Sequence, residues 1–132
     1  MTEAVALRIG DDQAWVELAP EVDAPGQWRV TADWVGAFAA DFECDLRAGE
    51  AAAFADAFLA GVDGDGPFRL EVKESRDNPL QLRSVRTGDD LAFVVRLTPS
   101  GHDTTVHLDL EIDPMDRAEL RGRLDDFRRS LV

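Results

Sequence analysis

The hydrophobic period changes once within the stretch from residue 91 to residue 132, and this change constrains the fold more than any other feature of the sequence. Apolar and polar residues alternate over residues 91–97 and again over residues 106–112. A period of two is typical of strands that bury one face. After residue 113, apolar residues recur at helical spacing, at Leu120, Leu124, Phe127 and Leu131. The stretch therefore predicts a hairpin followed by an amphipathic helix over about residues 114–130.

The same two periods organise the rest of the chain. An alanine-rich segment over about residues 47–62 has one apolar stripe at helical spacing, and alanine is the best helix former. Alternating segments predict further strands, at residues 5–9, 15–18, 28–34, 38–44, 68–72 and 80–86. We therefore predict an α+β fold: a mostly antiparallel sheet of about six to eight strands, with the two helices packed on one face. A length of 132 residues fits one domain, residues 1–132.

The chain carries a formal net charge of −13, from 27 acidic and 14 basic residues. Residues 114–132 hold five arginines against four acidic residues, a net charge of +1, so residues 1–113 carry −14. A field of this sign repels the phosphates of nucleic acids and anionic lipids. We therefore expect no direct binding to nucleic acid or to a membrane, and a basic protein as the partner. Acidity also serves solubility alone, and that interpretation stays open.

Three features of the sequence favour a cytoplasmic protein. No apolar run approaches the ~20 residues that cross a bilayer. The N-terminal residues lack the basic and apolar regions of a signal peptide. Cys44 is the only cysteine, so no internal disulfide is possible. Its neighbours, Glu43 and Asp45, disfavour a reactive thiolate, and we expect Cys44 to be a small core residue.

The sequence contains few groups that could carry catalysis or bind a metal. It has no phosphate-binding or dinucleotide-binding glycine motif and no Cys-x-x-Cys pair, so we expect no cofactor and no catalytic residues. The only histidines are His102 and His107. His107 and Asp109 share the polar face of a predicted strand, with Asp103 near in sequence, but the spacing matches no zinc motif and lacks a firm third ligand. We predict no metal site, and keep a small metal-dependent enzyme as an alternative.

A glycine-rich turn at residues 61–67 has the beginning of a calcium-loop pattern. Asp63 and Asp65 take the first and third positions, but Pro67 and Phe68 stand where a ligand and a glycine are required. We therefore expect an ordinary turn without calcium.

The three tryptophans divide into two groups. Trp28 and Trp34 fall in the apolar register of a predicted strand, which indicates core positions. Trp15 lies on a predicted strand of uncertain register. Because aromatic side chains are common at binding hot spots, Trp15 is the candidate partner-binding residue.

The order of several segments is typical of one protein family. Phe42-Glu43-Cys44-Asp45-Leu46 leads into a helix that contains Phe54, Phe58 and Leu59. Next come Phe68-Arg69-Leu70-Glu71-Val72, two long strands, Ile112-Asp113 and a helix that ends at residues 127–131. This order, over about residues 28–132, resembles the small immunity proteins of bacterial polymorphic toxin systems, in particular the family paired with wall-associated tRNA-cleaving toxins, and related uncharacterised actinobacterial domains. The resemblance implies an α+β fold and an inhibitory binding function, and it supplies no catalytic residues.

Charge and resemblance together favour a small acidic cytoplasmic interaction protein, an immunity protein that neutralises a basic toxin. Two alternatives stay open: a scaffold or small-ligand-binding domain, and a small enzyme that uses His107, Asp109 and their neighbours. A neighbouring gene for a large toxin would favour the first hypothesis. A concave pocket that holds both histidines would favour the enzyme.

Overall fold

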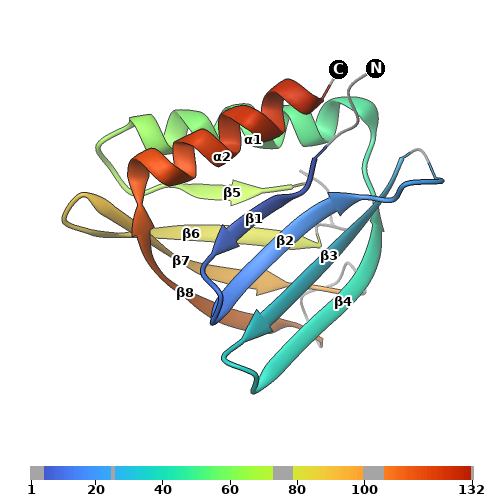
Figure 1. The fold of residues 1–132 in the computed structure, drawn as a ribbon, viewed down its shortest axis with the longest axis horizontal. Coiled ribbons are helices and arrows are strands. Elements are labelled where there is room, and N and C mark those ends of the chain that lie inside the picture. The colour runs from blue at the N-terminus through green and yellow to red at the C-terminus, as the bar shows by residue number, and fades with distance from the viewer. Residues whose placement is uncertain (1–4, 25, 73–78, 100–105, 132) are drawn as a thin grey trace.

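The computed structural model describes residues 5–24, 26–72, 79–99 and 106–131, which form two helices and eight strands (Figure 1). In chain order the elements are β1 (Leu7–Gly10), β2 (Ala14–Pro20), β3 (Gln27–Trp34), β4 (Phe38–Asp45), α1 (Ala48–Asp63), β5 (Arg69–Glu71), β6 (Leu80–Thr87), β7 (Asp90–Leu97), β8 (Leu108–Asp116) and α2 (Arg117–Ser130). The predicted α+β class and both predicted helices are confirmed.

The strands form two antiparallel sheets of four strands each, rather than one continuous sheet. Sheet A has the order β1-β2-β3-β4, and sheet B has the order β5-β6-β7-β8. Each sheet is a meander, because every strand pairs with its neighbour in the chain. The division falls at α1, whose 16 residues lie between the last strand of sheet A and the first strand of sheet B.

The core lies between the inner faces of the two sheets and the apolar stripes of the helices, which lie side by side (Figure 1). Phe58 on α1 packs edge-on against Phe93 of β7, with ring centroids 5.5 Å apart. Phe127 on α2 packs in the same way against Trp28 of β3, at 6.0 Å. Each helix thus contributes aromatic contacts to a different sheet. Trp28 is buried, as predicted, whereas Trp34 is only partly buried against the core.

The C-terminal helix also closes the edge of β1. Arg123 on α2 donates hydrogen bonds from Nη1 to the backbone oxygens of Arg8 (3.1 Å) and Gly10 (3.2 Å). The backbone N–H of Val5 donates to Ser130 Oγ (3.0 Å), and β1 also contacts β8. The beginning and the end of the described chain are therefore tied together beside sheet A.

The helix α2 begins at Arg117, later than the predicted start at about residue 114, because β8 continues to Asp116. Met115 is buried and pairs with β7 next to a bulge in the β7–β8 pairing. Pro114 falls within this bulge, a position that tolerates a residue without a backbone N–H. The Asp116 side chain accepts a hydrogen bond from the backbone N–H of Glu119 (3.0 Å) and caps the helix.

Candidate functional site

The outer face of sheet A gathers acidic side chains from β2, β3 and β4. Buried residues alternate along β2 and β3, so the residues between them share the outer face. The pairing of β1 with β2 places Arg8 beside Glu17 on this face, and the pairing of β3 with β4 places Arg29 beside Glu43. We call it the acidic face, and it holds six carboxylates: Glu17, Glu21, Asp33, Asp41, Glu43 and Asp45. The guanidinium groups of Arg8 and Arg29 are the two basic groups among them, which leaves a net charge of −4 on the described part of this face.

Arg29 lies at the centre of the acidic face. Its Nε donates to Glu21 Oε1 (2.7 Å), its Nη2 donates to Glu43 Oε1 (2.9 Å), and its Nη1 donates to Asp41. The hydrogen bond to Asp41, followed by that to Glu21, raises the pKa of the Arg29 guanidinium. Three carboxylates around one guanidinium leave two negative charges in excess. The Asp41 and Glu43 side chains remain 64% and 59% exposed, so this excess faces solvent.

Trp15, the candidate partner-binding residue, lies on the acidic face, where it pairs with Asp33 across β2 and β3. Its side chain is half-buried, and the Arg8 guanidinium carbon lies 3.9 Å from the ring centroid. Arg8 Nε also donates to Glu17 Oε2 (2.9 Å), which holds the guanidinium over the ring. The structure therefore settles the register of Trp15, which faces outward with the Arg8 side chain stacked over its ring.

The structure brings His107 and Asp109 together, with 3.5 Å between His107 Nδ1 and Asp109 Oδ1. Asp109 is also bound by Arg96 on β7, whose Nε and Nη2 donate to its two oxygens at 2.9 Å and 3.1 Å. These hydrogen bonds from Arg96 lower the pKa of Asp109. Among the described residues, no group of three or more His, Cys, Asp and Glu side chains could hold a metal ion. His102 and Asp103 lie outside the described residues.

Arginines also hold the turn after α1, where the sequence has the beginning of a calcium-loop pattern. Asp63 accepts hydrogen bonds from Arg121 Nε (2.8 Å) and Nη2 (3.0 Å). Arg86 donates to the backbone oxygens of Gly64 and Gly66. The Asp63 carboxylate and two backbone oxygens of this turn are therefore bonded to guanidinium groups.

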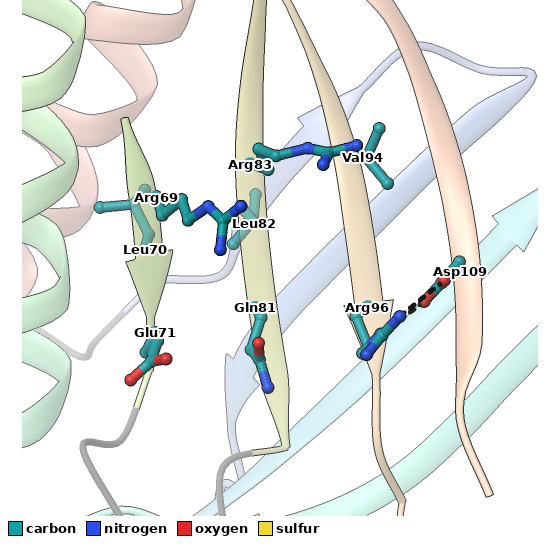
Figure 2. A pocket seen from close by; sticks show the side chains of 9 residues that line it. All are labelled: Arg69, Leu70, Glu71, Gln81, Leu82, Arg83, Val94, Arg96 and Asp109. Atoms are coloured by element: carbon teal, nitrogen blue, oxygen red, sulfur yellow. Dashed lines mark hydrogen bonds and ion pairs between the residues drawn. The ribbon is translucent and has the colours of Figure 1, made fainter. Parts of the chain in front are cut away.

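The outer face of sheet B carries a second surface, which the sequence patterns do not single out. An open hollow of about 290 Å³ extends over β5, β6 and β7. Figure 2 shows the side chains that line it. We call it the arginine hollow, because its lining includes Arg69, Arg83 and Arg96, together with Gln81 and Asp109. The only sequence signal is that each arginine occupies a polar position of an alternating strand, and alternation does not say which strands are neighbours. A larger hollow, of about 660 Å³, lies between α1 and β5 and shares Arg69.

Comparisons with known proteins do not assign a family to this chain. No protein family model, no curated protein and no solved structure matches it. In the described ranges of the chain, neither helix is long and apolar enough to cross a membrane. The functional interpretation of the two surfaces therefore depends on their geometry and charge.

Proposed function

We propose that the protein acts by binding a basic protein through the acidic face of sheet A. The observation that carries this proposal is the presence of six carboxylates and two guanidinium groups on one outer sheet face. Complementary charge raises the rate of association with a basic partner and disfavours acidic ones. The net charge of the whole chain, −13, acts in the same direction at longer range.

Two features of the acidic face suit a binding role. The cluster around Arg29 offers the exposed carboxylates of Asp41 and Glu43 to lysine or arginine side chains of a partner. Trp15 lies on the same face, and burial of an aromatic side chain at the centre of an interface is a common source of affinity. We propose that the carboxylates steer the encounter, and that Trp15 with the stacked Arg8 side chain makes the buried contact.

In its more specific form, the proposal is that the partner is a basic toxin that cleaves nucleic acid, and that the protein neutralises it in the cytoplasm. The order of elements supports this form through its resemblance to immunity proteins. Charge supports it as well, because an acidic face competes with nucleic-acid phosphates for the basic residues of a nuclease. An inhibitor of this kind needs no catalytic group of its own and acts in stoichiometric amounts.

Two matched double variants test the role of the acidic face. Asp41→Asn with Glu43→Gln removes two charges from that face. Asp89→Asn with Asp126→Asn removes two charges from exposed positions in the β6–β7 turn and on α2. The unchanged protein and both variants are used for cross-linked capture from the source organism, and association rates with the captured protein are measured at several salt concentrations. We expect a basic partner whose association at low salt slows about threefold or more for the acidic-face variant alone, and a difference that disappears at high salt.

Either of two results would contradict the proposal: an acidic partner, or equal association rates for the two double variants. Where the captured protein cleaves nucleic acid, one equivalent of the unchanged protein should stop the cleavage. Continued cleavage within a stable complex would refute the inhibitory role and retain the binding role.

A further inference from the structure

Arg69 and Arg83 stand directly opposite each other on the outer face of sheet B, as Cα partners of β5 and β6. Like charges at directly opposed positions destabilise a sheet. Within the part of the chain that the structure describes, neither guanidinium forms an ion pair, although acidic residues outnumber basic ones 27 to 14. On the outer face of sheet B, Arg69 and Arg83 are therefore two adjacent guanidinium groups without an ion-pair partner among the described residues.

Both guanidinium groups lie over the arginine hollow (Figure 2). The Arg69 side chain extends over β6 and away from Glu71, and the Arg83 side chain extends over β7. Arg96 lies in the next row of the sheet, where its hydrogen bonds to Asp109 at 2.9 Å and 3.1 Å fix its position. The lining thus combines three guanidinium groups with two carboxylates, a net charge of +1 on a chain of net charge −13.

We propose that the arginine hollow binds a small phosphomonoester, and that Arg69 and Arg83 together hold its phosphate group. A guanidinium forms paired hydrogen bonds with phosphate oxygens, and a phosphate with nearly two negative charges balances the two arginines. The volume of about 290 Å³ is at the lower end for small-molecule sites, which favours a compact ester over a nucleotide. Gln81 and the Arg96–Asp109 pair lie on the same lining and offer hydrogen bonds to hydroxyl groups of the ester. The residues of this site are separate from the acidic face, so the inference does not depend on the proposed function.

Titration of the full chain with glycerol 3-phosphate, followed by nuclear magnetic resonance of backbone amides, tests the proposal. We expect saturable shifts around Arg69, Gln81 and Arg83. Because each arginine supplies charge-assisted hydrogen bonds, Arg69→Gln and Arg83→Gln should each raise the dissociation constant at least about tenfold. Arg129→Gln removes the same charge from an exposed position on α2, and it should leave the constant unchanged within about twofold.

Thermal unfolding separates binding from folding. Because Arg69 and Arg83 repel each other, Arg83→Gln should keep or raise the midpoint of unfolding without ligand. The same variant should lose the rise in midpoint that glycerol 3-phosphate causes in the unchanged protein, and glycerol alone should cause no rise. Three results would overturn the proposal: tighter binding of succinate than of glycerol 3-phosphate, shifts that do not saturate, or an equal loss of affinity in Arg129→Gln.

Discussion

Truncation of Phe58 tests the packing between α1 and sheet B. This side chain is fully buried, and its ring centroid lies 5.5 Å from that of Phe93, 5.8 Å from that of Phe54 and 6.1 Å from that of Phe68. A buried aromatic side chain removes at least about 150 Å² from water, which at ~25 cal/mol per Å² corresponds to about 4 kcal/mol. Phe→Ala changes in protein cores cost about 3–5 kcal/mol, including the cavity that they leave. We therefore expect Phe58→Ala to lower the free energy of unfolding by about 4 kcal/mol.

Phe38 provides a matched control, because the same atoms are deleted from a side chain that is 53% exposed. Its ring still packs against Trp34, with centroids 5.9 Å apart, so we expect Phe38→Ala to cost about 1 kcal/mol. Urea denaturation followed by circular dichroism measures both costs. Phe58→Leu keeps much of the volume and extends the series if the alanine variant does not fold. Equal costs for Phe58→Ala and Phe38→Ala would refute the placement of Phe58 in the core.

Three further changes test separate features of the structure. Asp116→Ala removes the N-cap of α2 and should cost about 1 kcal/mol in urea denaturation, whereas Asp126→Ala on the exposed side of that helix should cost less than about 0.5 kcal/mol. Gly10→Ala should cost at least about 2 kcal/mol and lower the thermal midpoint, because Gly10 has a φ of +119° and a Cβ there would lie 2.2 Å from a backbone oxygen of β2. Arg96→Gln should raise the pKa of Asp109 toward its ordinary value of about 3.9, as measured by a pH titration followed by nuclear magnetic resonance. The pKa of Asp109 is lower in the folded state than in the unfolded state, so the stabilising contribution of its carboxylate is present above about pH 4 and is lost as the pH falls through the folded-state pKa. The Arg96→Gln variant should lose this dependence of stability on acid pH.

Alternation of apolar and polar residues in the sequence predicts which face of a strand is buried, because successive side chains point to opposite faces. In β7 the expected apolar residues are the buried ones: Leu91, Phe93, Val95 and Leu97. Alternation does not predict how the strands divide between sheets, because the same pattern fits any antiparallel neighbour. The predicted start of α2 at about residue 114 is too early for a related reason. Met115 and Asp116 belong to β8, which continues past Pro114 only because of a bulge against β7.

The two candidate surfaces depend on pairing across strands, which no local pattern specifies. The acidic excess and the candidate residues Trp15 and Asp109 are visible in the sequence. The local pattern relates Asp109 only to its neighbours along the strand, whereas Arg96, the partner that fixes its side chain, lies 13 residues away on β7. The opposition of Arg69 and Arg83 is likewise a consequence of the β5–β6 register, and it becomes visible only once that register is known.

The hydrogen bonds from Arg123 to β1 also bear on how the protein folds during its synthesis. The two acceptors, on Arg8 and Gly10, precede Arg123 by 115 and 113 residues. While translation proceeds, the hairpins of sheet A can form from adjacent segments, but the hydrogen bonds from Arg123 to the edge of β1 cannot form until α2 leaves the ribosome. An open strand edge pairs readily with other chains, and contacts over such long sequence separations form slowly. A nascent chain stalled before α2 would therefore leave the backbone oxygens of Arg8 and Gly10 without this partner, and would be a target for chaperones or for aggregation.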